Sequence, residues 1–193
     1  MPEFQNVTKR FADDTVVEGF SLKLKKSSPT VIMGESGGGK TTLLRIAAGL
    51  EKADGGGFKA DGENIAYMFQ EDRLLPWKNS LDNTRAVLPR EHHPLAEKYL
   101  SLVGLDIETD GKKLPSELSG GMRQRVAFAR FLAYAEATNS TLLLLDEPFS
   151  ALDDATAERM INLLRTAAKD KYLLMVSHDE TDANRLGATV IKL

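Results

Sequence analysis

Hydrophobic residues recur along the chain at two spacings, which predict strands that alternate with helices. Apolar residues at every second position predict a strand over 16–24. Short apolar runs predict the other strands, at 4–11, 29–33, 65–69, 141–146, 172–177 and 188–193. Apolar residues three or four positions apart predict helices over 40–50, 120–135 and 155–169. The turn-rich segment 53–64 is predicted to be a connection.

Each predicted helix has one apolar face. These faces are formed by Leu43, Leu44, Ala47 and Leu50, by Met122, Val126, Ala129 and Ala133, and by Met160, Leu163, Leu164 and Ala167. The third helix has an acidic residue available as its N-cap, either Asp153 or Asp154.

The alternation of strands with helices predicts an α/β fold with a mainly parallel sheet. The continuous apolar run 142–145 is typical of a parallel strand that is covered on both faces. Composition changes between 71 and 117, where prolines separate short amphipathic helices. We interpret this segment as a small helical insertion, and its prolines are Pro76, Pro89, Pro94 and Pro115.

Composition excludes some classes of protein. With 193 residues, 42% hydrophobic and 27% charged, the chain is typical of one globular domain. A formal net charge of -3 predicts no basic surface, so nucleic acid is not an expected partner. No cysteine is present, which rules out disulfides and thiolate metal sites. The N-terminus has no apolar signal segment and the longest aliphatic run cannot span a bilayer, so we expect membrane association only through another protein.

The run Gly34–Thr41 (GESGGGKT) follows a predicted strand and opens a predicted helix, which is the context of a phosphate-binding loop. Its glycines allow backbone N–H groups to turn inward around phosphate oxygens, and the helix directs its positive end at the same anion. Lys40 would reach the terminal phosphates, and the Thr41 hydroxyl would bind a metal ion. The alternative is a flexible turn before a helix.

Asp146 and Glu147 stand at the end of the leucine-rich strand. Two acids leaving a buried strand are unfavourable unless they meet a cation or hydrogen-bond donors. Asp146 suits the coordination shell of Mg²⁺, and Glu147 suits the general base that polarises an attacking water. The alternative is that both residues merely begin a loop and cap a helix.

These motifs, together with LSGGM at 118–122, resemble the nucleotide-binding subunit of an ATP-binding cassette (ABC) transporter over nearly the full length. The resemblance implies a P-loop NTPase core, an N-terminal antiparallel β subdomain and a helical insertion. It divides a single domain, 1–193, into a core (1–70 and 118–193) and a helical subdomain (71–117).

The resemblance also assigns roles to individual residues. It assigns ATP binding to Phe11, Gly34, Glu35, Ser36, Gly37, Gly38, Gly39, Lys40, Thr41 and Thr42, and a second phosphate contact to Ser119, Gly120 and Gly121. It assigns Mg²⁺ to Thr41, Gln70 and Asp146, and catalysis to Glu147, His178, Lys40 and Gln70. Ser150–Asp153 matches the D-loop. Phe11 replaces the commoner tyrosine, so stacking on adenine survives and a hydroxyl contact is lost; Met122 replaces the more frequent glutamine.

The second phosphate contact, at Ser119, Gly120 and Gly121, is also expected from the residue types themselves. Ser119 is a good N-cap, and two glycines then open a long helix whose first N–H groups are free to bind an anion. One nucleotide does not need two separate helix N-termini, so this one is expected to serve the ATP of a second subunit. The alternative is a capped helix with no further role.

The function that this resemblance implies is ATP hydrolysis that powers solute transport through ATP-driven dimerisation. The implied partners are a transmembrane permease subunit, a second copy or paired ABC subunit, and a substrate-binding protein. The implied location is peripheral, on the cytoplasmic face of the inner membrane. The string QEDRLLPW resembles subunits of importers for nitrate, sulfonates and taurine. Alternatives are a non-transport ABC ATPase of the DNA repair or translation type, a module that binds ATP without hydrolysis, and a kinase-like P-loop enzyme.

Two further features allow two interpretations each, and a third is given one. The apolar segment 74–77 either packs within the helical insertion or forms a groove for a helix of the membrane partner. His178 is either a buried core histidine or the switch histidine of the family. Arg123, Arg125 and Arg130 are interpreted as ordinary surface and interface ion pairs.

Overall fold

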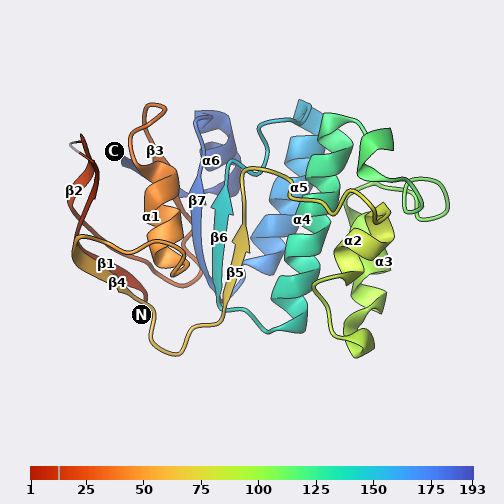
Figure 1. Cartoon of the computed structure of the whole chain (residues 1–193), viewed down its shortest axis with the longest axis horizontal. Coiled ribbons are helices and arrows are strands. Elements are labelled where there is room, and N and C mark those ends of the chain that lie inside the picture. Colours follow the sequence, from red (N-terminus) through yellow and green to blue (C-terminus); the bar gives the residue numbers. More distant parts are fainter. Residues whose placement is uncertain (13) are drawn as a thin grey trace.

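The strands form two sheets in the computed structural model, which describes residues 1–12 and 14–193 (Figure 1). The larger sheet is parallel, has five strands and has the order β5-β6-β7-β3-β8. Its strands are β3 (Thr30–Met33), β5 (Ile65–Met68), β6 (Leu142–Asp146), β7 (Tyr172–Val176) and β8 (Thr189–Lys192). The smaller sheet is antiparallel, with the order β2-β1-β4. Its strands are β1 (Glu3–Phe11), β2 (Asp14–Lys23) and β4 (Gly55–Lys59). The predicted α/β fold, with a mainly parallel sheet and an N-terminal antiparallel sheet, is therefore confirmed.

Helices cover both faces of the parallel sheet (Figure 1). Helix α1 lies between the two sheets. The other helices lie on the opposite face of the parallel sheet or farther from the sheet on that side. The α-helices are α1 (Lys40–Ala47), α2 (Ser80–Arg85), α3 (Pro94–Leu102), α4 (Gly120–Ala137), α5 (Asp154–Ala167) and α6 (Glu180–Leu186). Two short 3-10 helices are η1 (Arg90–His92) and η2 (Pro115–Glu117). Helix α1 contacts β4, β6 and β7, whereas α2 and α3 pack on α4.

The continuous leucine run of β6 divides its side chains between two hydrophobic cores. Leu143 and Leu145 belong to the core under α4 and α5, and Leu142 and Leu144 belong to the core under α1 and the small sheet. Successive strand residues point to opposite faces, so a strand covered on both faces needs apolar residues at every position. This explains why the run shows no alternation.

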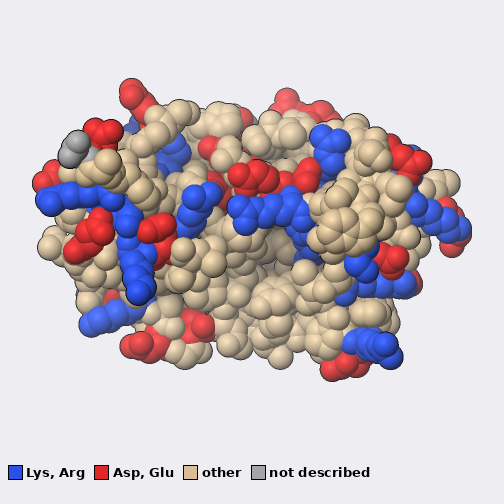
Figure 2. All heavy atoms as spheres, viewed as in Figure 1, with Lys and Arg blue, Asp and Glu red and all other residues tan. Residues whose placement is uncertain are grey.

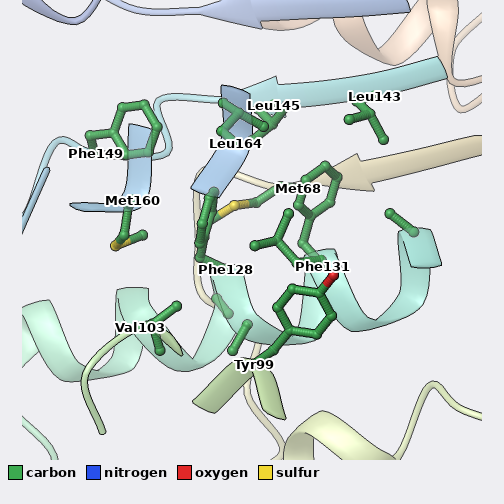
Figure 3. Close-up of a cluster of buried hydrophobic side chains, with 14 of the residues drawn as sticks. Met68, Tyr99, Val103, Phe128, Phe131, Leu143, Leu145, Phe149, Met160 and Leu164 are labelled. Atoms are coloured by element: carbon green, nitrogen blue, oxygen red, sulfur yellow. The ribbon is translucent and has the colours of Figure 1, made fainter. Parts of the chain in front are cut away.

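Helix α4 is buried on more than one side. The predicted face, including Val126, Ala129 and Ala133, is buried, but Phe128 and Phe131 are buried as well. Figure 3 shows Phe128 and Phe131 between the strand side chains above them and Tyr99 of α3 below them. The helix therefore lies between the parallel sheet and the α2–α3 segment.

Three sequence-based expectations differ from the structure. The segment 53–64, predicted as a connection, contains β4, because a glycine-rich edge strand carries little apolar signal. Helix α6 was not predicted, because seven residues are too few to show a clear period. Leu50 does not share the apolar face of α1, since the helix ends before Gly49 and the Leu50 side chain is exposed. Within 1–12 and 14–193, no helix combines the length and the apolar character needed to cross a bilayer.

Candidate nucleotide-binding and catalytic site

The carboxyl ends of four parallel strands bring the candidate residues to one edge of the sheet. Gly34 and Glu147 directly follow β3 and β6. Gln70 and His178 each lie two residues after the end of a strand, β5 and β7 respectively. Val176 of β7 lies opposite both Ile32 of β3 and Asp146 of β6. Because parallel strands end at the same edge, residues that are far apart in the sequence become neighbours.

The loop between β3 and α1 turns back on itself and ends at Lys40. The Lys40 ammonium is buried and donates to the carbonyls of Gly34 at 2.8 Å and Glu35 at 2.7 Å. Gly37 and Gly39 have φ values of 84° and 81°, a region that other residues rarely adopt. A Cβ at Gly39 would lie only 2.5 Å from the Val16 carbonyl oxygen. The loop thus requires glycine both for its conformation and for its close approach to β2.

Thr41 and Asp146 meet beneath this loop. The Thr41 hydroxyl donates to Oδ1 of Asp146 at 3.2 Å, and the Asp146 side chain is almost fully buried, with 1% of the residue exposed. Burial raises the pKa of Asp146, and the charge of Glu147 adds to this, while the Thr41 hydrogen bond opposes it. A buried carboxylate beside a hydroxyl is a fitting partial shell for Mg²⁺, because a nearby cation would favour the charged form.

Among the described residues, Thr41 and Asp146 form only part of a metal shell. No cluster of three or more His, Cys, Asp or Glu side chains able to hold a metal occurs in 1–12 or 14–193. Gln70 lies just beyond β5, beside the strand that ends at Asp146, and its side chain is exposed. Mg²⁺ commonly binds proteins through one or two carboxylates plus phosphates and waters. The donor set therefore fits Mg²⁺ that arrives with a nucleotide.

Glu147 and His178 form a direct pair at the same edge. Nδ1 of His178 lies 2.7 Å from Oε2 of Glu147, and since a carboxylate oxygen accepts, the Nδ1–H donates. The Glu147 side chain is only 12% exposed, whereas that of His178 is 66% exposed. His178 is therefore not a buried core histidine, and the interpretation that it contacts the catalytic region agrees with its position.

The backbone of Glu147 is strained and is held from several sides. Its φ is 47°, a value uncommon for a residue with a side chain. Its N–H donates to the Val176 carbonyl at 3.0 Å, and its own carbonyl accepts from the Ser150 hydroxyl at 3.2 Å. Strain of this kind persists only where surrounding contacts enforce it, and it is frequent at functional sites.

Ser119 caps α4 at the same edge of the molecule. Its hydroxyl oxygen accepts from the Met122 N–H at 3.2 Å, and Ser119 and Gly120 are exposed. Figure 1 shows the N-terminal ends of α1 and α4 at the same edge, with strands of the parallel sheet between them in this view. The predicted second phosphate contact thus faces outward. Gly121 lies close to the D-loop, because an added Cβ would be 3.2 Å from the Ala151 carbonyl oxygen.

Phe11 ends β1 and offers an exposed ring. The Lys9 ammonium lies 5.0 Å from the centre of that ring and is itself held by Glu51 at 2.9 Å. Phe11 is 47% exposed, so its aromatic ring is available for stacking on a base.

Sequence reasoning missed Gln124. Its side chain is buried and donates through Nε2 to the Pro148 carbonyl at 2.9 Å and the Glu147 carbonyl at 3.5 Å. This connects α4 to the loop that carries Glu147. The signal that could have revealed Gln124 was a polar residue on the side of a long helix that packs against the protein core.

The arginines of α4 correct another expectation. Arg123 pairs with Asp72, as expected of an ordinary ion pair. Arg130 is partly buried and donates to the backbone carbonyls of Asp72 and Arg73, so these bonds stand where an ion pair was expected. Burial lowers its pKa, and the charge of Asp72 opposes this.

The segment 74–77 divides between its two interpretations. Leu74 packs against the main core, whereas Trp77 is 72% exposed. A cavity of about 330 Å³ lies nearby, between the end of β5, residues 69–73 and α4. Figure 2 shows this face hollowed near its centre, with an uncharged floor and charged side chains at the border. The apolar residues that line the cavity include Phe69, Val87 and Phe131.

The chain is similar to known proteins over nearly its full length. A profile of the ABC transporter family matches residues 17–150. Aliphatic sulfonates import ATP-binding proteins are among its curated relatives. The protein from Xanthomonas axonopodis pv. citri is 40% identical over 98% of this chain and 66% of its own length. The protein from Ralstonia nicotianae is 41% identical over 96% and 66%, and that from Agrobacterium fabrum is 42% identical over 95% and 72%.

The chain spans 66% of the length of the first two of these relatives. Among solved structures, the dimer of an ATP-binding cassette in a post-hydrolysis state, bound to ADP and Pi, matches with a TM-score of 0.86 and 28% identity. That match covers 100% of this chain and 94% of the other.

Proposed function

Because this chain belongs to the ABC transporter family, we propose that it binds and hydrolyses ATP to power solute transport through a separate transmembrane subunit. The observation that carries the proposal is the pairing of Glu147 with His178 at 2.7 Å beside the buried Thr41–Asp146 pair. A module that only binds ATP would not need a carboxylate held in this way. A non-transport ATPase of the same family is not favoured, since the similar proteins described above are importer subunits.

We propose that ATP binds along the loop that precedes α1. Phe11 stacks on adenine, and the backbone N–H groups of Glu35, Ser36 and Gly37 to Thr42 surround the phosphates. The ammonium of Lys40 exchanges its present partners, the Gly34 and Glu35 carbonyls, for phosphate oxygens. This exchange costs little, because both states satisfy the buried ammonium with oxygen acceptors.

In this proposal Thr41, Asp146 and Gln70 hold Mg²⁺. When bound, Mg²⁺ neutralises charge on the phosphate oxygens and on the leaving group. The chain's contribution is to hold a carboxylate and a hydroxyl 3.2 Å apart before the ion arrives. Pre-arranged ligands reduce the reorganisation that binding requires.

Hydrolysis requires a base beside the attacking water. In our proposal, Glu147 accepts a proton from water as the water oxygen bonds to the terminal phosphorus and the bond to the ADP oxygen breaks. His178 donates to Oε2 of Glu147, which orients the carboxylate and leaves Oε1 for the water. The strained backbone of Glu147, held by Val176 and Ser150, keeps this orientation.

We propose that two copies, or one copy and a paired subunit, enclose two nucleotides. Ser119, Gly120 and Gly121 of one copy then contact the phosphates bound by the other. The outward position of Ser119 and the dimeric state of a similar structure support this arrangement. Residues 71–117 act as a helical subdomain beside the core formed by 1–70 and 118–193.

The cavity beside β5 is the proposed contact for the transmembrane permease subunit. Its apolar floor suits a helix of the partner, and the exposed Trp77 lies on the same connection. This contact would place the chain on the cytoplasmic face of the membrane as a peripheral subunit. By analogy with the similar proteins, the solute is a small organic acid such as an aliphatic sulfonate, delivered by a substrate-binding protein.

Glu147→Gln tests the proposal. The amide cannot accept the proton of the water, so phosphate release should fall at least ~100-fold, the lower range for loss of a general base. ATP binding should remain, and an ATP-stabilised dimer should accumulate. Glu91→Gln, an exposed change on η1, is the matched control and should behave as wild type. Normal phosphate release by the Glu147 variant would remove Glu147 from this role. A wild-type chain that releases no phosphate, with or without permease, would refute the function.

A further inference from the structure

Arg130 of α4 holds the loop that follows Gln70. Its two terminal nitrogens donate to consecutive backbone carbonyls, Nη2 to Asp72 at 2.6 Å and Nη1 to Arg73 at 3.0 Å. The planar guanidinium suits this arrangement, because its donors are arranged in a rigid fork. The bond to Asp72 is short and partly buried, whereas the bond to Arg73 has an ordinary length and is exposed.

Arg123 holds the same loop two turns earlier on the helix. Its Nε donates to Oδ2 of Asp72 at 3.1 Å, and its Nη1 donates to the Leu118 carbonyl at 3.0 Å. Asp72 is therefore bound to α4 through both its side chain and its backbone. Leu118 directly precedes Ser119, so Arg123 connects the loop to the beginning of α4.

The loop itself is not a relaxed turn. Arg73 has a φ of 46°, and its guanidinium lies 3.6 Å from the centre of the Phe69 ring. A residue with a side chain adopts such a φ only where its surroundings enforce it. The two bonds from Arg130 to this segment are contacts that oppose its relaxation.

We propose that Arg123 and Arg130 are positioning residues that keep Gln70 in place relative to Ser119. Gln70 and Ser119 both have roles in the proposed ATP hydrolysis, so the inference depends on the proposed function. Gln70 serves the metal of one nucleotide, and Ser119 serves the nucleotide of the second copy. Because the arginines connect them, Gln70 and Ser119 move as one body. When Ser119 closes on the nucleotide of the second copy, Gln70 is therefore positioned at the metal of its own nucleotide.

The same contacts reach the cavity proposed for the permease. Arg73 and Arg130 line it, together with Glu71 and Phe69 of the loop. A partner that fills the cavity presses on the residues that connect the loop to α4. The geometry thus gives the partner direct access to the position of Gln70 and of Ser119.

Arg125 provides a matched comparison on the same helix. Its Nη1 donates to the Gly104 carbonyl at 2.9 Å and the Val103 carbonyl at 3.3 Å, which lie after α3 and away from the loop. Arg125→Lys therefore removes from α4 a guanidinium that also bonds two backbone carbonyls, through one nitrogen, without touching residues 70–74. Lysine keeps the positive charge but lacks the rigid planar arrangement of donors that the guanidinium has.

The first measurement is amide hydrogen exchange of residues 70–75 in the full chain without nucleotide. Arg130→Lys should speed this exchange at least ~10-fold, because it removes bonds from a charged donor. Arg125→Lys should leave it within about twofold of wild type. An unchanged rate in the Arg130 variant, or an equal increase in the Arg125 variant, would overturn the proposal.

The second measurement separates positioning from general stability. With ATP as substrate, Arg130→Lys should raise the Mg²⁺ concentration for half-maximal hydrolysis by about fivefold, while the dissociation constant for ATP stays within about twofold. Faster exchange with an unchanged Mg²⁺ requirement would overturn the role of the arginines in the reaction. If wild type hydrolyses no ATP, the proposed function fails, and the exchange result still decides whether Arg130 holds the loop.

Asp72→Asn covers the case in which the Arg130 variant does not fold. It removes the charged acceptor of Arg123 and keeps both bonds of Arg130. Exchange of residues 70–75 should rise about threefold, and the Mg²⁺ requirement should shift in the same direction as in the Arg130 variant. Wild-type values in both measurements would contradict the proposal.

Discussion

Gly39→Ala should be far more damaging than the neighbouring change Gly37→Ala. Both glycines have a positive φ near 80°, 81° for Gly39 and 84° for Gly37. They differ in their surroundings, since a Cβ at Gly37 would meet nothing within 4 Å. At Gly39 it would lie 2.5 Å from the Val16 carbonyl oxygen and 2.6 Å from Cγ2 of Val17.

The two costs can be separated. An alanine in this left-handed region costs about 1–2 kcal/mol, and this term applies to both variants. Only Gly39→Ala adds a steric term, because ordinary contact begins near 3.4 Å and the Cβ would be about 0.9 Å too close to a backbone atom. Relieving such a contact in a packed region costs about 1–3 kcal/mol. The free energy of unfolding should therefore fall by about 1–2 kcal/mol for Gly37→Ala and by about 2–5 kcal/mol for Gly39→Ala.

Urea unfolding followed by circular dichroism, without nucleotide, measures this difference. The Gly39 variant should also bind ATP at least ~10-fold more weakly, because the loop must move away from β2 and shift the Lys40 ammonium. Equal losses of stability in the two variants would refute the reasoning, since the approach of β2 would then carry no cost. A Gly39 variant with wild-type ATP affinity would show that the loop tolerates the shift.

Two further outcomes are expected. Burial, with the charge of Asp146 adding to it, raises the pKa of Tyr67 to about 12. The absorbance of tyrosinate should thus show a step near pH 12 that Tyr67→Phe removes. The free energy of unfolding should decline between pH 10 and 12, because the unfolded chain releases the Tyr67 proton at a lower pH than the folded chain does. A tyrosine titration confined to the region near pH 10 would contradict this. Ser119→Arg, in the Glu147→Gln background, should abolish the ATP-dependent dimer and keep ATP binding by the monomer, as judged by light scattering and nucleotide titration. Ser101→Arg, an exposed change on α3, is its control, and a Ser119 variant that still dimerises would exclude the two-copy site.

Contiguous motifs could be predicted from the residues alone. The strand, glycine-rich loop and helix around Gly34–Thr41 involve neighbours in the sequence, so spacing and glycine content predict the element that forms. Thr41 and Asp146 were both expected at one metal ion from the family resemblance, and their side chains do meet at 3.2 Å. Asp153 was one of two predicted N-caps, and it is the residue that accepts from Thr156.

Structural features that depend on contacts with distant segments of the chain could not be predicted in this way. β4 is glycine-rich and becomes a strand because β1 supplies its hydrogen-bond partners. The segment 74–77 allowed two interpretations, and only the packed chain shows that Leu74 joins the core while Trp77 is exposed. Periodicity reports which face of a helix is apolar, but it carries no information about what packs against the other faces.

The residues of α4 show this division most clearly. Local order along the helix is enough to predict that Ser119 caps it and that apolar side chains such as Val126 face a core. Arg130 was interpreted as a surface residue and Gln124 was not noticed. The sequence of a helix does not show whether an arginine or glutamine side chain is hydrated or bonds a backbone carbonyl. Their partners, at Asp72 and Pro148, lie far away in the sequence and reach α4 only when the sheet, the loop after β5 and the loop after β6 fold together. Hydrogen bonds between distant segments depend on position in space, and position in space is a property of the packed chain.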